Sequence, residues 1–580
     1  MDLRLTVAIS LWILLFAFAI KWAFSVEECG RKQWIQRALF FCVTMFVALV
    51  AWRWRSICYE GEINLDESQL LAQAMRYKAD LMPWRSVDGG SSGPLNTWLL
   101  FWAPVLGFKF DYLAARLTSV LCITAMFSGL GAALVSLLGG ARAFLVLMPA
   151  FTFVATTTNL DFAFLGSEQL PSAISAWIIF FIVQQARAPR SLYGFLIGVL
   201  TGALPFCKIQ IGPTAVFLFT VGAGACAVRM GGVRIALAHL GIQAAGGLVI
   251  PLLILIPVAI GGAWDDFMEF YIRAALSYGN TLNKWQSSSI KSFLWGVQEF
   301  GVLTLGTFVL AALSFVLVWI RGGLKSISKT RLLAVVVMLA YVVLVAGSIL
   351  RTGYPFPHYL MFLMVPYVAF VGVCLSCSQK AVSNKPEELV QDLKKGKRPI
   401  RTAGPAVETS PRHAFSAVML CGVTLMQALA TVGDLSRNKQ FLPNWGPAKH
   451  PMGELIKNMT ESGDSIVVWG WVPKFYVFSE MFPGTRFMQT LFLLDESPKF
   501  SRAREVYLTA FINDLEQSKP KLFIDAPDEF IWPEYPHGAL GRHWAVPKIS
   551  EYIRSNYTLA GSFPYPQGSG KADIMVYKRK

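Results

Sequence analysis

The sequence has few charged residues for its length. Asp, Glu, Lys and Arg make up 15% of its 580 residues, whereas hydrophobic residues make up 54%. An ordinary soluble domain carries roughly 25% charged residues. Long apolar runs recur from residue 6 to residue 432 and then stop. These features exclude a wholly soluble protein and predict a polytopic α-helical membrane protein with a soluble C-terminal part.

Cysteine is absent where a secreted domain would need it for disulfides. None of the 9 cysteines lies beyond Cys421, so the C-terminal part has no disulfide framework. Cys374 and Cys377 have the spacing of a redox or metal pair, but no second pair and no histidine accompanies them. A lone pair of this kind at a helix end is weak evidence for a metal site.

The C-terminal part also lacks a glycine-rich phosphate loop and a cluster of metal ligands, and the whole chain has no internal repeat. His537 and His543 are isolated, which favours structural or surface roles. The net charge is +16, but the basic residues lie mostly in short loops between apolar runs. The positive-inside rule explains that placement, so no nucleic-acid partner is expected.

The apolar runs predict about twelve membrane spans. The first run has no small-residue cleavage motif before Glu27 and Glu28, which favours a retained helix over a signal peptide. Basic residues cluster in alternate loops, which places those loops in the cytoplasm. The loop at 53–111 and everything after 433 are then outside. The spans are predicted near 6–25, 37–52, 112–138, 144–159, 170–185, 192–207, 213–228, 241–262, 296–320, 332–350, 359–377 and 414–432.

This pattern divides the chain into a multi-helix transmembrane domain at 1–432 and an extracytoplasmic α/β domain at 433–580. The basic segment at 378–413 is predicted to be a cytoplasmic loop that contacts anionic lipid or only fixes the topology. In the C-terminal domain, β-type runs alternate with helical patterns, as in a small α/β fold. The runs are 465–469, 521–525 and 573–577, and the helical patterns lie near 452–461, 501–517 and 547–556.

An adjacent pair of acids, Asp66 and Glu67, stands out in the first external loop. Asn64 can cap a helix there, with Glu67 as the acidic half of a capping box. Negative charge in a first turn also suits the helix dipole. Capping alone does not require the acids to lie at a membrane surface beside other polar residues, so a catalytic role is the competing interpretation.

Further ionisable residues gather in the loops predicted to be external. Ionisable groups at a bilayer edge that face a cavity are candidates for function. Acidic and basic residues both occur in the loops predicted for this outer face. They are Arg76, Lys78, Asp80, Arg85 and Asp88 in the first loop, and Asp161, Glu168, Lys208, Asp265, Asp266, Glu269, Arg273, Arg351 and His358 in later loops.

Several motifs together resemble those of a known superfamily. The acidic pair is followed by Gly93-Pro94-Leu95-Asn96 before a helix and then by Ala114-Ala115-Arg116-Leu117. This order resembles the GT-C superfamily of polyprenyl-phosphate-sugar-dependent glycosyltransferases, and within it bacterial relatives of the protein O-mannosyltransferases and the lipid A aminoarabinose transferase. Weaker similarities extend this resemblance over nearly the whole chain. They lie at 198–202, which leads to Lys208, at 358–360, in a span that closes with Pro366, and at 468–471, which is followed by 476–479.

The resemblance implies a membrane glycosyltransferase that moves a hexose or pentose. A sugar linked through phosphate to a long isoprenoid would be transferred to an acceptor hydroxyl at the outer surface, with inversion at the anomeric carbon. The attacking hydroxyl needs a general base, which a carboxylate can supply. The lipid phosphate leaves readily without an acid, but it needs cationic stabilisation from Arg, Lys or a divalent cation such as Mg²⁺ or Mn²⁺.

The same resemblance assigns roles to particular residues. Asp66 would be the base, and Glu67 would orient the acceptor or a cation. Glu168 is taken as the second-loop acid, with Asp161 as the alternative. The phosphate contacts would be Arg85, Lys208, Arg351 and His358, although Lys and Arg at span ends also snorkel to the interface and His358 could be an ordinary interfacial histidine.

Two features depart from the family pattern. The acidic pair follows the second apolar run, whereas the family usually places it after the first. An extra N-terminal helix or removal of residues 6–25 would account for the difference. The tyrosine usually close to the pair stands at Tyr59, too far away to receive a role.

Other classes of protein remain open from the sequence. A secondary transporter would also be polytopic with charges in the membrane, but such proteins often show internal repeats and helices broken at the midplane. A non-catalytic envelope-assembly subunit and a wall-polymer ligase are further alternatives. The favoured prediction is a transferase of the bacterial inner membrane that acts on a lipid, glycan or protein acceptor.

Overall fold

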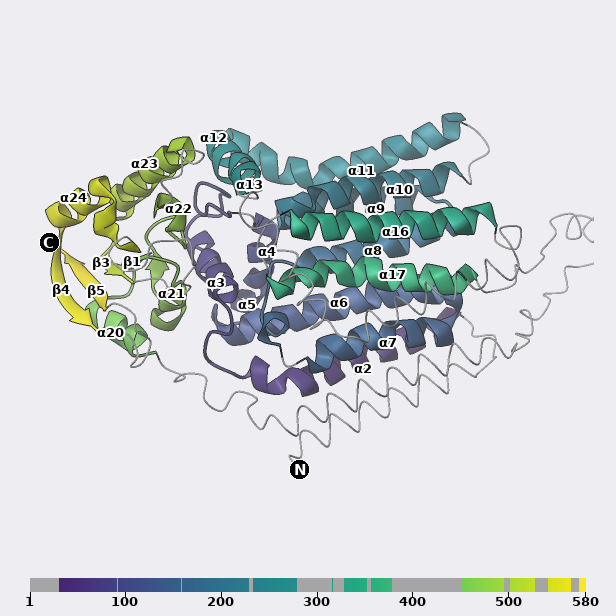
Figure 1. Ribbon diagram of the computed structural model, residues 1–580, viewed down its shortest axis with the longest axis horizontal. Helices are drawn as coiled ribbons and strands as arrows, with labels where there is room; N and C mark the ends of the chain where they lie inside the picture. Colours follow the sequence, from purple (N-terminus) through teal and green to yellow (C-terminus); the bar gives the residue numbers. More distant parts are fainter. Residues whose placement is uncertain are drawn as a thin grey trace, which may run out of the picture.

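The computed structural model of the chain describes residues 31–90, 92–157, 159–228, 233–278, 316, 328–351, 356–377, 450–494, 501–526, 541–564 and 573–580. Long helices lie side by side in a bundle, and a small sheet domain stands at one end of it (Figure 1). Short helices of the loop between α2 and α6 lie between these two parts. The predicted combination of a polytopic helical domain and a C-terminal α/β domain is confirmed.

The bundle is made of apolar helices that bury their mutual contacts and leave apolar side chains on the outside. Six described helices are long and apolar enough to cross a membrane, so the chain is a multi-pass membrane protein. The bundle helices are α2 (Arg31–Ile57), α6 (Tyr112–Leu138), α7 (Gly140–Thr156), α8 (Gln169–Arg187), α9 (Ser191–Cys207), α10 (Gly212–Ala227), α11 (Val233–Ile260), α16 (Lys329–Leu350) and α17 (Met361–Cys377).

Every predicted span within the described residues overlaps one of these helices. The predicted spans at 6–25 and 414–432, all but one residue of 296–320, the basic segment 378–413 and the domain boundary at 432 lie outside the described residues. The total of about twelve spans therefore stays a prediction.

Helices α9 and α11 pack unusually closely because glycines line their contact. A Cβ atom at Gly198 would collide with the backbone oxygen of Gln243, and one at Gly202 would collide with that of Gly247. From the other side, a Cβ at Gly246 would meet the backbone oxygen of Phe195. Small residues at four-residue spacing let helix backbones approach in a membrane, where packing replaces the hydrophobic effect.

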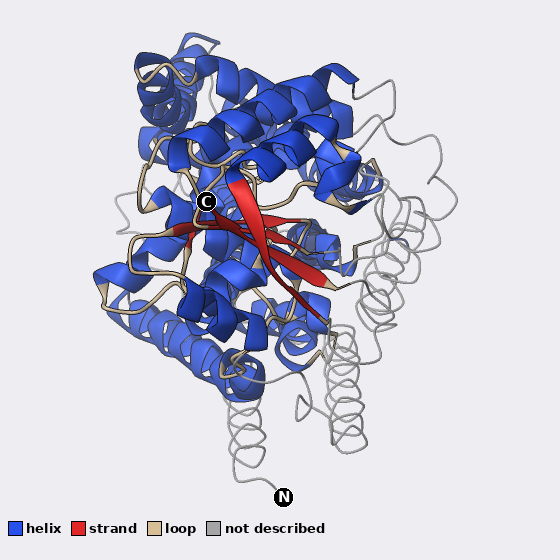
Figure 2. Ribbon diagram, turned by 90° about the vertical axis from the view of Figure 1, so that its left-hand side faces the viewer, coloured by secondary structure: helices blue, strands red, loops and turns tan. Residues whose placement is uncertain are grey.

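The sheet domain has a mixed five-stranded sheet in the order β2-β1-β3-β5-β4. Its strands are drawn in red in Figure 2. Strand β1 pairs in parallel with β2 and β3, whereas β5 runs antiparallel to β3 and β4. The strands are β1 (Ser465–Trp469), β2 (Phe482–Pro483), β3 (Leu522–Asp525), β4 (Tyr557–Phe563) and β5 (Ile574–Arg579). The helices are α20 (Pro451–Met459), α21 (Lys474–Ser479), α22 (Leu491–Leu494), α23 (Ser501–Ser518) and α24 (Pro547–Asn556).

Alternation along the central strands divides this domain into two cores. Ile466 and Val468 face one core together with residues of α20 and α21. Val467 and Trp469 face the other core, which α23 and α24 cover. Successive side chains of a strand point to opposite faces, so a continuously apolar strand such as β1 needs helices on both sides.

The strands and helices predicted in this domain are confirmed with boundaries that shift by a few residues. Strands β2 and β4 were not predicted. β4 lies at the sheet edge, most of its side chains are exposed, and a register shift between Leu559 and Gly561 interrupts it. An edge strand with a bulge and a glycine has no clean alternation to recognise.

Contacts from the sheet domain tie it to the outer loops of the bundle. Arg486 forms ion pairs with Asp514 of its own domain at 2.9 Å and with Asp266 at 3.0 Å. Asp266 belongs to α12 (Trp264–Phe267), which leads into a π-helical turn at Met268–Arg273 and α13 (Ala274–Tyr278). Arg486 also donates to the backbone oxygen of Trp84 in the first loop. The sheet domain is therefore docked by partly buried charge as well as by apolar contact.

Candidate active site

Asp66 lies in the first turn of α3 (Leu65–Tyr77), which stands between the bundle and the sheet domain (Figure 1). Asn64 adopts an extended backbone, and its side-chain oxygen accepts a hydrogen bond from the Asp66 backbone N–H at 3.0 Å. This cap satisfies a donor that a helix start leaves free. The predicted start of the helix at Asn64 is confirmed, and it fixes Asp66 at the helix N-terminus.

His358 is the direct neighbour of Asp66. Its Nε2 lies 3.6 Å from Oδ2 of Asp66, and the Asp66 side chain remains 30% exposed whereas that of His358 is 4% exposed. His358 belongs to the short helix at Pro357–Leu360 that leads into α17. Asp66 is therefore reachable from solvent while its histidine neighbour lies beneath it.

Aromatic rings hold His358 in one orientation. Phe356 stacks on the imidazole at a centroid distance of 5.2 Å, and Phe164 and Tyr359 meet it edge-on at 5.5 and 4.9 Å. Neither ring nitrogen has a hydrogen-bond partner among the described residues. Buried polar atoms of this kind are costly unless a partner arrives. The imidazole is thus a preformed donor or acceptor directed at the space beside Asp66.

Lys208 and Glu168 form a buried ion pair at the same end of the bundle. Their side chains are 3% and 1% exposed. The Lys208 ammonium also donates to Oγ of Ser167 at 2.8 Å and lies 4.5 Å from the centre of the Tyr359 ring. One oxygen of Glu168, Oε2, has no partner among the described residues. The pair therefore keeps a free acceptor atom near His358.

The Gly93-Pro94-Leu95-Asn96 motif packs directly against this pair. Gly93 approaches the end of α9 so closely that a Cβ would collide with the backbone oxygen of Phe206. The Asn96 amide donates to the oxygens of Cys207 at 2.7 Å and of Ser167 at 3.2 Å. The motif thus joins the loops that carry Lys208 and Glu168 at the start of α4 (Pro94–Trp98).

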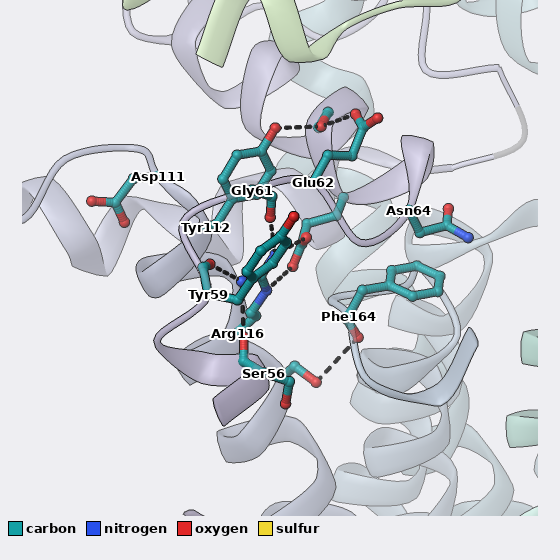
Figure 3. Close-up of polar contacts among 12 residues, drawn as sticks. Ser56, Tyr59, Gly61, Glu62, Asn64, Asp111, Tyr112, Arg116 and Phe164 are labelled. Carbon is teal, nitrogen blue, oxygen red and sulfur yellow. Dashed lines mark hydrogen bonds and ion pairs between the residues drawn. The ribbon is translucent and has the colours of Figure 1, made fainter. Parts of the chain in front are cut away.

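Glu67 forms a closed ion pair with Arg116 of α6, and Figure 3 shows Arg116 among the residues of the first loop. The carboxylate accepts from Nε at 3.1 Å and from Nη2 at 2.9 Å, and both side chains are buried. Arg116 also donates to the backbone oxygens of Ser56, Tyr59 and Gly61. The expected capping-box role of Glu67 is therefore replaced by a tertiary pair that ties the first loop to α6.

Burial and neighbouring charges set the acid–base properties of the cluster. Burial raises the pKa of Asp66 above the ordinary 3.8; His358 opposes this shift and Glu168 adds to it. Burial likewise raises the pKa of Asp161, whose carboxylate accepts from the Asn64 amide at 3.2 Å. Burial alone would raise the pKa of Glu168, but the charges of Lys208 and His358 and the hydrogen bond from Lys208 together outweigh burial and hold that pKa below its ordinary value. Asp66 is thus the more basic of the two carboxylates, and Glu168 is the one held in its charged form.

The structure brings together Asp66, Glu168, Lys208 and His358, with the alternative acid Asp161 beside them. Arg85 lies apart in an exposed ion pair with Asp80 at 3.0 Å. Arg351 is exposed at the C-terminal end of α16. No contact among the described residues joins either arginine to the cluster. Their predicted phosphate contacts stay predictions.

Sequence reasoning gave no role to Arg116, Ser167 or Asn96. Arg116 and Asn96 stood inside the motifs that carried the family resemblance, so the signal was present without a function attached. Their partners lie far away along the chain, and a single sequence does not reveal such pairs.

The described residues contain no group of three or more His, Cys, Asp or Glu side chains arranged to hold a metal ion.

The sheet domain reaches α3 from the opposite side. Nε1 of Trp471, in the loop after β1, donates to Oε1 of Gln69 at 2.9 Å. Nζ of Lys474 lies 3.8 Å from Oε1 of Glu62. Helix α3 is therefore held between the heads of the bundle helices and the loop after β1.

No family model and no curated protein sequence matches the chain. Among solved structures it is similar to apo ArnT from Cupriavidus metallidurans, with 12% identity, a TM-score of 0.40, and coverage of 92% of this chain and 97% of that one. ArnT bound to undecaprenyl phosphate gives 10% identity, a TM-score of 0.40, and coverage of 94% and 98%.

The archaeal oligosaccharyltransferase AglB from Archaeoglobus fulgidus, in complex with an inhibitory peptide and a dolichol-phosphate, is also similar. It gives 11% identity, a TM-score of 0.45, and coverage of 85% of this chain and 70% of that one. These identities and TM-scores are too low to assign a function to the chain.

Proposed function

We propose that the chain is a membrane glycosyltransferase that moves a sugar from a polyprenyl-phosphate-linked donor to an acceptor hydroxyl. The observation that carries this proposal is the placement of Asp66. It is a partly exposed carboxylate at a capped helix N-terminus, 3.6 Å from a buried histidine. It lies at the end of an apolar bundle, where a lipid-linked phosphate would present its sugar.

In the proposed reaction Asp66 is the general base. Its carboxylate accepts the proton of the acceptor hydroxyl as the hydroxyl oxygen attacks the anomeric carbon. The bond between that carbon and the phosphate oxygen breaks, and the polyprenyl phosphate leaves with the bonding electrons. The raised pKa of Asp66 makes it a stronger base than an exposed aspartate. A base of this kind contributes about 10²–10⁴-fold to the rate.

His358 is the proposed first contact of the leaving phosphate. Its two ring nitrogens have no partner among the described residues, and a protonated imidazole would donate a charge-assisted hydrogen bond to a phosphate oxygen. Lys208 lies close enough to influence the pKa of Asp66, but Glu168 neutralises it in the described conformation. Lys208 would bind phosphate only by exchanging one of its present partners. Arg85 and Arg351 are further proposed phosphate contacts on the outer face.

Glu67 is proposed as a positioning residue, because Arg116 occupies its carboxylate.

A divalent cation, Mg²⁺ or Mn²⁺, is the second proposed source of positive charge at the phosphate. Removing divalent cations with EDTA and restoring them one at a time during the transfer assay tests that role. Recovery with one cation supports it, and full activity in EDTA rejects it.

The proposed setting is the bacterial inner membrane, with Asp66 and the sheet domain on the extracytoplasmic side. The acceptor is proposed to be an envelope glycolipid, a polysaccharide or a protein, and the sugar a hexose or a pentose. A reporter fused at residue 440 tests this topology. Activity of a reporter that works only in the cytoplasm would contradict it.

The function itself is tested with purified protein and a panel of polyprenyl-phosphate hexoses and pentoses. Envelope material from a strain lacking the protein serves as the acceptor. Transfer of labelled sugar to that material, with release of polyprenyl phosphate, is the expected result. Movement of a solute across vesicles with no glycosylated product would favour a transporter instead. If the protein shows neither transfer nor transport, the remaining alternative is a non-catalytic envelope-assembly subunit.

A further inference from the structure

The loop after β1 is built to hold one side chain against α3. Gly470 has a positive φ of 114°, and a Cβ there would collide with the backbone oxygen of Ala526. Its N–H donates to Oγ1 of Thr490 at 2.7 Å. Only glycine fits this backbone without strain. The next residue, Trp471, is therefore directed by a fixed turn.

Trp471 contacts the same helical face that carries Asp66. Its indole N–H donates to Gln69 at 2.9 Å, and residues three apart on a helix are neighbours on one face. Lys474 pairs with Glu62 just before α3, and both side chains are nearly buried. The loop is therefore anchored before and after Asp66.

Residues of the bundle lie on one side of Asp66, and a residue of the sheet domain lies on the other. His358 and Lys208 stand at the ends of bundle helices, which is the side from which a lipid phosphate would arrive. Trp471 belongs to the sheet domain, which stands beyond α3 away from the bundle (Figure 1). In a one-step displacement the attacking oxygen approaches opposite the leaving group. An acceptor that enters opposite the phosphate therefore passes Trp471.

We propose that Trp471, held by Gln69, forms the acceptor-side wall of the Asp66 site and determines the affinity for the hydroxyl-bearing acceptor. This inference rests on the proposed transfer reaction. It makes the sheet domain part of the binding site, because the membrane part alone would leave the Asp66 face open on that side. The donor would bind without this wall, since its contacts lie on the bundle side.

The test measures transfer by the full-length protein while the envelope acceptor fraction is varied at fixed donor. Trp471→Phe keeps a ring but removes the indole donor, and Gln69→Leu removes the same bond from α3. Each variant releases the Trp471 wall from α3 and should raise the half-saturating acceptor concentration about 3- to 10-fold, because binding must then supply the ordering that this bond provides. The maximal rate and the half-saturating donor concentration should stay within about twofold.

Two further variants make the result specific. Gln69→Glu retains an oxygen that accepts from the indole and should stay near the wild type. Trp544→Phe carries the same substitution in the same domain, where Trp544 contacts His543 and Arg542, and should leave the acceptor dependence unchanged. The double variant Trp471→Phe/Gln69→Leu should have a half-saturating acceptor concentration no higher than that of the more affected single variant. Both substitutions remove the same hydrogen bond, so their effects should not add.

Equal effects of Trp471→Phe and Trp544→Phe would overturn the inference. So would a fall in maximal rate with unchanged half-saturation by acceptor, which indicates a purely structural role. As a control, each variant should bind undecaprenyl phosphate as the wild type does, which shows that its proposed donor site is correctly folded. Absence of transfer by the wild-type chain would overturn the proposed function together with this inference. Transfer with unaltered acceptor dependence in both variants would overturn the inference alone.

Discussion

Nε2 of His358 lies 3.6 Å from the carboxylate of Asp66, and this contact joins the loop between α2 and α6 to the start of α17. The two residues come from distant parts of the chain and meet at one end of the bundle. The histidine is buried among aromatic rings and the aspartate is partly exposed. Their contact places a carboxylate that solvent can reach beside an imidazole nitrogen that it cannot.

This contact predicts the acid limb of the pH–rate profile. Burial raises the pKa of Asp66 above 3.8, and His358 opposes the shift. Because a general base acts only when ionised, transfer should fall as the pH drops through this raised pKa. His358→Gln removes the opposing charge, so the acid limb should move to higher pH. The measurement is kcat/KM against pH for both proteins. An acid limb that moves to lower pH in His358→Gln would contradict the assignment.

The Glu67–Arg116 pair predicts a large effect on stability. Glu67→Gln leaves a buried guanidinium without its counter-charge, which should destabilise the fold by about 3–5 kcal/mol. Thermal unfolding of the detergent-solubilised protein measures the loss. Glu480→Gln is the matched control, because Glu480 forms only exposed pairs with Lys109 and Lys457 and should change stability by about 0–1 kcal/mol. Equal effects of the two substitutions would refute a structural role for Glu67.

Asp88 predicts a loss of stability with rising pH. Burial raises its pKa from 3.8 to about 7, against an opposing effect of Arg486. The folded state then binds the proton more tightly than the unfolded chain. The contribution of this carboxyl to stability is therefore full below about pH 4 and should fall by about 1.4 kcal/mol per pH unit between about 4 and 7. Asp88→Asn should abolish this decline, whereas Asp265→Asn, at an exposed position, should retain it. A decline of the same size in Asp88→Asn would exclude this carboxyl as its source.

The close packing of α9 against α11 predicts that Gly198 does not tolerate a methyl group. Its Cβ would collide with the backbone oxygen of Gln243, so Gly198→Ala should force the helices apart and cost about 1–3 kcal/mol. Gly224 in α10 has nothing within 4 Å of its Cβ position. Gly224→Ala should be neutral or stabilise by up to about 1 kcal/mol. Unfolding temperatures that fall equally in both variants would contradict this view of the interface.

Local patterns predicted much of the fold. Apolar runs predicted the bundle helices because a membrane span needs a long stretch of apolar residues. Asn64 predicted the start of α3 because a cap is a local interaction. The central strands were recognisable because they are apolar and bounded by turns. Strand β4 was missed because its exposed, bulged edge pairs with β5 without an apolar pattern.

Tertiary pairing limited the prediction of the site. Asp66 was assigned as the base through the family resemblance of its loop, which is a local pattern in the sequence. The partner of Glu67 was not found, because Arg116 becomes its neighbour only after α6 packs against the first loop. Lys208 was expected to face phosphate, but the structure pairs it with Glu168. Trp471 and Gln69 are 402 residues apart, and only the docking of the sheet domain brings them together.

The base assigned to Asp66 is the central claim, and Asp66→Asn tests it most directly. The substitution keeps the shape of the side chain and removes its basicity. Transfer of labelled sugar from the polyprenyl-phosphate donor should fall at least about 100-fold, while binding of undecaprenyl phosphate and the unfolding temperature stay near those of the wild type. Transfer at the wild-type rate by a folded Asp66→Asn protein would contradict the account.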